Sequence, residues 1–418
     1  LFLSTVFSAT MLVPHAVRAQ EPVPAPANYV AHEWGTFTSM VGQDGLVLDG
    51  LHHEEESLPA FVHDLWNVEE FAVAEGQKLP ASRVTQKMET PVIYFYTDEP
   101  MRVVASVWFQ QGLMTQFFPL PSIVCPDLTV GRSARVDMSK VPFSTLEWDV
   151  DLIPKGAVMP PEIPAVANDD PWAFARMTQA SYVRTRVAKD SPAKTEAEHY
   201  LFYRGLGRWQ PKVALKAAND GAATFENQMP QAIPFALALE LDERGGRYAC
   251  CDGVSPREQV AFALSAAAIE PDRERFARTV GAIVMQALVE QGLYLDEARA
   301  MVATWTRSWF MKDGARVVYL LPQEQLREVL HLSLVPQPKE LVRVLVGRLE
   351  FITRATQRRV EQALRDQASS DAVAAARGKA VLTGLERFLE PHLRNVERNG
   401  ADAVVQRAAT LLLEQPQR

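Results

Sequence analysis

Cysteine is scarce in this chain of 418 residues, which contains only Cys125, Cys250 and Cys251. No CxxC pair is present, and this argues against a thiolate zinc site and against a thioredoxin-like redox motif. The absence of CxxCH excludes the usual attachment of a c-type haem. If the protein is exported, we expect Cys125 to form a disulfide with one of the adjacent pair, a strained Cys250–Cys251 bridge being the rarer option.

The chain has fewer basic than acidic residues, and its formal net charge is −8. An acidic chain lacks the positive footprint that nucleic-acid binding requires, so we expect no nucleic-acid partner. Neither GxGxxG nor a P-loop occurs, and nucleotide binding is therefore unsupported. The lack of GxSxG leaves a serine nucleophile without its usual motif.

Long apolar runs are absent except at the start of the sequence. Residues 1–19, LFLSTVFSATMLVPHAVRA, combine an apolar run with small residues at Val17 and Ala19, and we interpret them as a signal peptide. The run is short for a membrane anchor, and no later segment resembles a transmembrane helix. Residues 20–28 read as a Pro/Ala linker. We therefore expect a secreted or periplasmic protein without a membrane span after signal removal.

The pattern between residues 29 and 254 is typical of β-structure. Roughly eight to ten short segments with strand character are separated by turn residues, which indicates a β-sandwich-like domain. The clearest is 144–154, where apolar and polar residues alternate. Residues 89–109 read as two strands joined in a hairpin by the turn TDEP.

Helical periodicity becomes prominent after residue 255. Residues 255–352 are expected to form an α+β segment packed on the β-rich domain, and 353–418 a helical tail of two or three helices. The predicted fold class is therefore α+β, with a β-sandwich-like N-terminal half packed against a helical C-terminal half. The alternative is one interleaved domain, in which the strands of 315–352 join the front sheet.

Histidine and glutamate concentrate in GLHHEEESLPAFVH, residues 50–63. A turn through GQDGLVLDG would return this loop to the strand that carries His32. Imidazole nitrogens and carboxylate oxygens bind divalent ions, zinc above all. We therefore predict a metal site with Glu55 as general base and, as ligands, His32, His52, His53 and Glu54. The alternative is a solvated turn before a capped helix over 57–72.

Arginine and aromatic side chains suggest two further sites. Arg204 and Arg208 flank a Gly-Leu-Gly turn in YRGLGRW, where they would hold an anionic group of a substrate, or else serve the structure of the turn. Aromatic residues on the predicted strands would stack on sugars or peptides if they were exposed, although core positions are the commoner outcome. These aromatic residues are Trp34, Tyr94, Tyr96, Trp108 and Trp148.

Several strings give the chain a family resemblance. AHEWGTFTS, GLHHEEE, METPVIYFY and YRGLGRW, followed by RAMVATWTRSWF and LVRVLVGRLE, together resemble a family of uncharacterised exported bacterial proteins. The resemblance spans residues 30–350 and leaves out the tail. It implies export and one cooperative unit across the front and middle of the chain, and it transfers no catalytic residue because the family has no established activity.

These observations lead to two functional hypotheses. The first is an exported metal-dependent hydrolase or lyase that acts on an extracellular polymer, in which the bound ion lowers the pKa of a water molecule. The second is a non-catalytic binding module, or a subunit of a periplasmic or extracellular assembly. In that case the helices of 353–415 would bind a protein partner.

Overall fold

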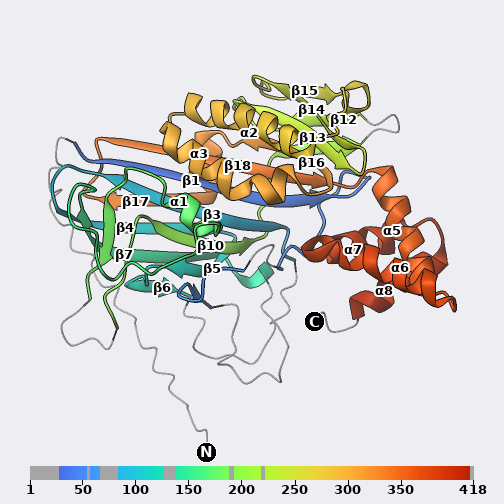
Figure 1. The fold of residues 1–418 in the computed structure, drawn as a ribbon, viewed down its shortest axis with the longest axis horizontal. Coiled ribbons are helices and arrows are strands. Elements are labelled where there is room, and N and C mark those ends of the chain that lie inside the picture. Colours follow the sequence, from blue (N-terminus) through green and yellow to red (C-terminus); the bar gives the residue numbers. More distant parts are fainter. Residues whose placement is uncertain are drawn as a thin grey trace, which may run out of the picture.

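Two β-sheets packed face to face form the centre of the molecule (Figure 1). The computed structural model describes residues 28–53, 57–65, 83–126, 138–187, 193–217 and 222–414. The predicted signal peptide, nearly all of the predicted linker, Glu54 and Glu55 lie outside these residues. The larger sheet has nine strands, in the order β14 (Gly245–Cys251), β13 (Ala236–Asp242), β16 (Gly314–Leu320), β18 (Glu340–Phe351), β1 (Val30–Val41), β3 (Gln86–Tyr96), β10 (Leu201–Gly207), β5 (Gly112–Phe118) and β2 (His63–Asp64).

The second sheet covers one face of the first. It consists of β17 (Leu330–Val335), β4 (Met101–Gln110), β7 (Phe143–Ile153), β8 (Tyr182–Thr185) and β9 (Ala197–Glu198), with β6 (Ile123–Cys125) paired to β7. Trp148 of β7 and Tyr203 of β10 meet between the sheets, with ring centroids 6.1 Å apart. The alternation predicted for β7 is confirmed, since Leu146, Trp148, Val150 and Leu152 are fully buried. The sandwich is therefore built from one-sided strands facing a common core.

Helices cover the other face of the nine-stranded sheet (Figure 1). The short α1 (Pro171–Ala175) and the longer α2 (Arg273–Glu290) and α3 (Leu295–Trp305) pack there, and a π-helical turn, η3 (Thr306–Phe310), continues α3. Because this sheet is covered on both faces, β1 is buried along nearly its whole length. The remaining elements are β11 (Val213–Ala217), β12 (Ala223–Asn227), β15 (Gln259–Phe262), α4 (Gln323–Val329), η1 (Met138–Lys140) and η2 (Leu264–Ala266).

The fold class predicted from the sequence, α+β with a β-sandwich packed against helices, is confirmed. The boundary drawn at residue 255 does not divide the main sheet, because β16 and β18 lie within it and β18 pairs in parallel with β1. The structure therefore matches the alternative prediction of one interleaved domain, in which the strands of 315–352 join the front sheet. A chain that returns to the middle of a sheet buries its last strands on both sides, and the apolar patterns of β16 and β18 fit that position.

Two local predictions were wrong. Residues 89–109 do form two strands, but β3 belongs to the larger sheet and β4 to the smaller, so TDEP joins the two layers instead of closing a hairpin. In 57–65, the described part of the predicted helix 57–72, there is no helix; His63 and Asp64 form β2, which pairs with β5. Neighbouring strands outcompete the helical spacing because edge pairing satisfies their backbone groups.

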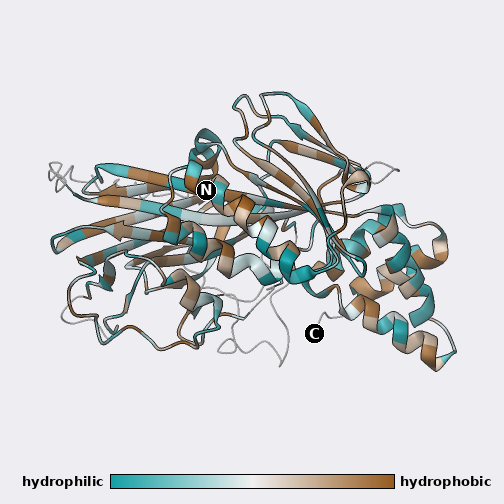
Figure 2. Ribbon diagram, turned by 45° about the horizontal axis from the view of Figure 1, so that its top comes forward, coloured by the Kyte–Doolittle hydropathy of each residue, from teal (hydrophilic) through white to brown (hydrophobic). Residues whose placement is uncertain are grey.

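The tail contains four α-helices where two or three were predicted: α5 (Arg354–Gln367), α6 (Ala372–Thr383), α7 (Leu389–Asn399) and α8 (Ala403–Glu414). Their apolar residues form a separate small core. Figure 2 shows apolar and polar bands along these helices, as expected where each helix buries one face. A 3₁₀ turn, η4 (Glu386–Phe388), precedes α7, and both lie beside one end of the nine-stranded sheet (Figure 1).

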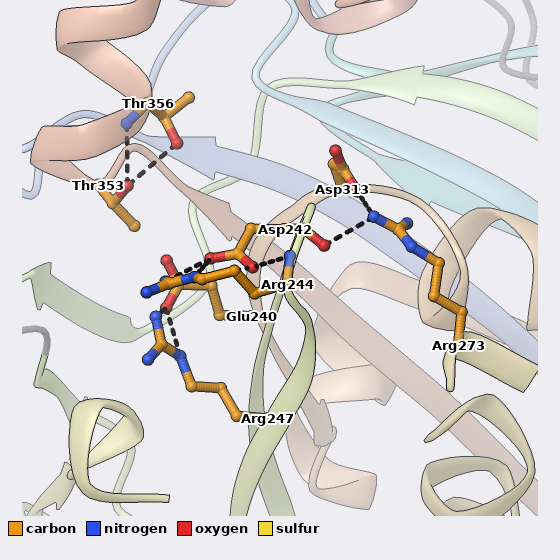
Figure 3. Close-up of polar contacts among 8 residues, drawn as sticks. All are labelled: Glu240, Asp242, Arg244, Arg247, Arg273, Asp313, Thr353 and Thr356. Carbon is orange, nitrogen blue, oxygen red and sulfur yellow. Dashed lines mark hydrogen bonds and ion pairs between the residues drawn. The ribbon is translucent and has the colours of Figure 1, made fainter. Parts of the chain in front are cut away.

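Charged side chains fasten the hairpin of β13 and β14 to its surroundings (Figure 3). Arg247 pairs with Glu240 across the hairpin at 2.7 Å, and Arg273 of α2 donates to the Asp242 carbonyl oxygen and to Asp313, both at 2.7 Å. Nearby, the Thr353 hydroxyl caps α5 by accepting from the Thr356 amide at 3.1 Å. The contacts of Arg273 thus hold the first turn of α2 against the hairpin, and the Thr353 cap marks the start of α5.

The predicted disulfide is absent, because Cys125, Cys250 and Cys251 are all free thiols. Cys125 lies on β6 of the smaller sheet, whereas the adjacent pair ends β14, the outermost strand of the larger one. Separate sheets keep the thiols from the short Cβ–Cβ approach that a bridge requires. Among the described residues, no helix is both long and apolar enough to cross a membrane.

Candidate metal centre

His52 and His53 meet a carboxylate, but it comes from the tail and not from the adjacent glutamates. Their Nε2 atoms lie 3.5 and 3.9 Å from Oε2 of Glu390, which belongs to α7. One ligand atom from each of the three residues can be chosen so that all lie within 4.8 Å of one another. The His52–His53–Glu390 group could therefore hold a metal ion.

The loop that carries the histidines is held by backbone hydrogen bonds and packs closely on Glu390 of the tail. The Leu48 amide donates to the Met40 carbonyl at 2.8 Å, and the Gly50 amide to the Val84 carbonyl at 3.1 Å. Gly50 adopts a φ of 107°, and a Cβ there would lie 2.7 Å from Cγ of Glu390. Glycine is thus required twice, for the backbone conformation and for the close approach of the glutamate.

The spacing within this group is compatible with a shared ion. Ligands about 2.0–2.1 Å from a tetrahedral zinc lie about 3.4 Å from one another, whereas an N–H···O hydrogen bond is about 2.9 Å long. The observed 3.5 and 3.9 Å are closer to the first value. Both His52 and Glu390 are buried, at 7% and 6% exposure, so partners for their polar atoms matter energetically.

The second oxygen of Glu390 has a different partner. Arg394, one turn further along α7, donates to Oε1 from Nε at 2.9 Å and from Nη2 at 2.6 Å. Such a contact orients a carboxylate and leaves Oε2 directed at the histidines. Burial raises the pKa of nearby Asp49 above its usual range, with Glu390 adding to this effect and Arg394 opposing it.

His32 does not join this group. It lies near the start of β1, whereas the loop pairs near Met40, eight residues later and roughly 26 Å along a strand. Its Nδ1 lies 2.8 Å from Oε2 of Glu297, both side chains being fully buried, and the Tyr96 hydroxyl donates to Oε1 of the same glutamate at 2.7 Å. The expected return of the loop to His32 was wrong because β18 and β3 occupy both sides of β1.

The other predicted site residues are placed as follows. Glu54 and Glu55 lie outside the described residues. Arg204 is buried within β10 and lines a cavity on the helix-covered face of the sheet, while Arg208 follows the end of β10 and is not among the residues that line it. Trp34, Tyr94 and Trp148 are core residues, which was the commoner alternative. Trp34 also lines the cavity beside Arg204.

The ligand set predicted from the sequence does not contain Glu390. Its surroundings, FLEPHLRNVERN, read as an ordinary amphipathic helix, and nothing in them marks one glutamate as a ligand. Only the packing of the tail on the loop brings the two together. A search for carboxylates on buried helix faces would have kept Glu390 as one candidate among several.

Comparisons with known proteins add little. No protein-family model and no curated protein sequence matches the chain. Among solved structures, the yeast delta-COP-I mu-homology domain is similar, both alone and in complex with a Dsl1 WxWxV peptide. In each case the identity is 8%, the match covers 79% of this chain and 98% of the other, and the TM-score is 0.26. A likeness at this level carries no argument about function.

Proposed function

We propose that the protein is an exported metal-dependent enzyme, a hydrolase or lyase that acts on an extracellular polymer. The observation that carries the proposal is the convergence of His52, His53 and Glu390 on one point from two distant segments. Two histidines and one glutamate form a ligand set known from catalytic zinc sites, where the fourth position holds water. Zinc is the ion that this donor set favours, although other divalent ions accept the same atoms.

The chain's own residues would divide the work as follows. His52, His53 and Glu390 would hold the ion, and Arg394 would keep Glu390 in position. A bound divalent ion supplies a water of lowered pKa and polarises an oxygen of the substrate. His53 is the most exposed ligand, with 20% of its side chain accessible, and marks the side from which solvent reaches the group.

The first test is metal content. Purified protein is dialysed against dilute zinc, passed through a desalting column and analysed for bound metal. We expect one equivalent in the wild type and less than a tenth of that in Glu390→Gln. Glu397→Gln, an exposed position on the same helix, is the matched control and should bind as the wild type does. Equal zinc in all three proteins would contradict the proposed ligand set.

The second test separates catalysis from structure. Cobalt replaces zinc with visible absorption bands that respond to changes in coordination. A catalytic ion keeps an open position, so azide should change the spectrum of the cobalt protein, and the metal-loaded protein should cleave at least one member of a panel of extracellular polymers that the metal-free protein leaves intact. A spectrum unmoved by azide, with no metal-dependent cleavage, would exclude the enzyme.

One observation favours a non-catalytic alternative. The group joins the tail to the sandwich and is largely buried, as expected of an ion that clamps two parts of a fold. The tail also exposes apolar side chains, with Val373 73%, Val404 69% and Leu411 50% accessible. In this second proposal the protein is a binding module or assembly subunit, and the tail helices contact the partner.

A further inference from the structure

We propose that the cavity on the helix-covered face of the nine-stranded sheet binds the acetamido group of a neutral, N-acetylated ligand. This cavity, called here the tryptophan cavity, is lined by Trp34, Thr90, Trp172, Phe202 and Trp305, among others. Binding there requires no metal ion, so the inference goes beyond the proposed enzyme. Only the identification of an N-acetylated extracellular polymer as the substrate rests on the proposed function.

The cavity lies where three neighbouring strands are irregular at the same level. The register between β1 and β3 shifts between Trp34 and Thr36, and β10 shifts against both of its neighbours just after Phe202. Bulges redirect side chains and are common beside functional sites. On the helix side, α1 and α3 complete the wall with one tryptophan each, Trp172 and Trp305.

Backbone strain is located at the same place. Thr90 of β3 has a φ of 46°, in the left-handed region that β-branched residues avoid. Its neighbour Pro91 packs so closely on β1 that a Cβ on Gly35 would lie 2.7 Å from the proline Cα. Residues held in such conformations cluster at ligand-binding and active sites.

The charged groups of the wall already have partners. Glu89 accepts from Arg387, with Nη1 2.6 Å from Oε1, and Asp170 accepts from the Trp172 amide at 2.8 Å. Arg204 also lines the cavity and has an interaction of its own. A charged ligand would have to compete for these groups or be buried without a counter-charge, which is costly. The wall therefore favours a neutral ligand.

Neutral donors in the wall lack an acceptor. Thr90 Oγ1 and Trp305 Nε1 are buried and have no hydrogen-bond partner among the described residues, and Trp305 is only 5% exposed. Buried polar groups without partners are rare, and each calls for an explanation such as an absent ligand or water. An indole N–H only donates, whereas a hydroxyl donates or accepts. The carbonyl oxygen of an amide matches the indole, and the amide N–H matches the hydroxyl.

Missing partners are not general in this wall. The Tyr200 hydroxyl donates to the Trp172 carbonyl at 3.2 Å, and the Thr304 hydroxyl donates to the Ala300 carbonyl at 2.9 Å. The Trp172 indole N–H donates to Glu198 at 2.9 Å. Polar side chains around the cavity thus find partners within the protein where the packing provides them.

The size of the cavity limits the ligand. Its volume is about 50 Å³, and a group the size of a water molecule needs about 10–15 Å³. The cavity therefore holds roughly four such groups. An acetamido group has a methyl carbon, a carbonyl carbon, an oxygen and a nitrogen, and so fills this space. The rings of Trp34 and Trp172 would enclose its methyl group.

Two chain connections place the cavity near the candidate metal centre. Ser57 lines the cavity and follows His53 by four residues, a stretch that spans at most about 14 Å when fully extended. Glu89, also in the wall, pairs with Arg387, which precedes Glu390 by three residues. If the proposed enzyme is correct, an acetamido group held in the cavity would anchor the polymer beside the ion.

The test is a titration of metal-depleted full-length protein with N-acetylglucosamine, followed by tryptophan fluorescence and calorimetry. Glucose carries a hydroxyl in place of the acetamido group and serves as the ligand control. We expect saturable binding of N-acetylglucosamine on the order of millimolar, as suits so few buried atoms, and at least tenfold weaker binding of glucose. Absence of saturable binding, or equal binding of glucose, would overturn the proposal.

Three variants locate the binding. Trp305→Phe keeps an aromatic ring but loses the N–H, and should weaken the binding of N-acetylglucosamine at least fivefold. Thr90→Val keeps the side-chain shape and should weaken it several-fold without loss of stability, because the hydroxyl has no partner within the described protein. Trp108→Phe, outside the cavity wall, should bind as the wild type does.

Circular dichroism and urea unfolding show which variants fold. If Trp305→Phe fails to fold, Thr90→Val decides, and wild-type affinity in either folded variant overturns the proposal. Cleavage assays with metal-loaded wild type separate this proposal from the enzyme. Binding of N-acetylglucosamine without metal-dependent cleavage of any polymer leaves the cavity assignment standing and counts against the enzyme alone. Equal cleavage of a polymer and of its N-deacetylated form would contradict the identification of the substrate.

Discussion

Arg387 of η4 and Glu89 of β3 form a buried ion pair across 298 residues of sequence, with Nη1 2.6 Å from Oε1. The two side chains are 0% and 1% exposed. Glu89 lines the cavity on the helix-covered face of the nine-stranded sheet, and Arg387 precedes the metal-binding candidate Glu390 by less than one helical turn. This single pair therefore connects the tail, the cavity and the candidate metal centre.

Breaking this pair should be costly. In Arg387→Met the Glu89 carboxylate stays buried without its counter-charge, and we expect a loss of about 3–5 kcal/mol in the free energy of unfolding. Urea unfolding measures this loss. Arg365→Met removes the exposed pair with Asp402 at 2.8 Å and should cost no more than about 1 kcal/mol. Similar small losses in both variants would show that the buried pair does not hold the tail.

The double variant Glu89→Gln/Arg387→Met isolates the uncompensated charge. With both charges removed, much of the stability should return, because the cost of the single variant comes mainly from a carboxylate left without a partner. A double variant less stable than Arg387→Met would mean that the pair's attraction, and not desolvation, dominates.

The sequence was informative where one residue pattern determined one local structure. The alternation in 144–154 predicted β7 correctly, because a single buried face decides that element. The sequence did not show to which of the two sheets each strand belongs. The turn between β3 and β4 has the residues of a hairpin, and only the competition among neighbouring strands sends β4 into the second sheet.

Only part of the candidate metal site could be predicted from the sequence. His52 and His53 are adjacent in the chain, so their density could be read directly from the sequence. Their carboxylate partner could not be read, since its position depends on how the tail packs on the loop. His32 was wrongly included because it lies near the start of β1, whereas the loop that carries His52 and His53 pairs near Met40 at the other end of that strand. The sequence does not show at which end of the strand the loop returns.

Zinc should stabilise the protein if the His52–His53–Glu390 group binds it. A ligand at about 100 times its Kd adds about 2.7 kcal/mol to the folded state when the unfolded chain does not bind. We expect the thermal midpoint to rise with zinc in the wild type and in Glu397→Gln, but not in Glu390→Gln. Scanning calorimetry with and without chelator gives these midpoints. A zinc response retained in Glu390→Gln would assign the ion to a different site.

Acid should destabilise the protein through His199. Burial, aided by Lys155 and Arg176, lowers the pKa of this histidine from its usual 6.5 to about 3. Between these two pH values the unfolded chain carries a proton at this residue that the folded protein does not. Stability from this source is therefore complete above pH 6.5 and is lost as the pH falls toward 3.

The measurement compares wild type with His199→Asn. At pH 4.5 the wild type should have lost about 2–3 kcal/mol through this residue relative to pH 7.5, a loss that the variant lacks. Urea unfolding at four pH values in that interval, with chelator present throughout, gives both profiles. Parallel profiles would show that His199 becomes protonated in the folded state as readily as in the unfolded chain.

Gly35 should resist substitution more than any open-turn glycine. A Cβ at this position would lie 2.7 Å from the Cα of Pro91, a backbone atom that cannot rotate away, whereas a Cβ on Gly156 would meet no atom within 4 Å. We expect Gly35→Ala to cost about 1–3 kcal/mol in urea unfolding and Gly156→Ala to stay within about 0.5 kcal/mol of wild type. Unchanged stability in Gly35→Ala would show that β1 and β3 move apart at this position without strain.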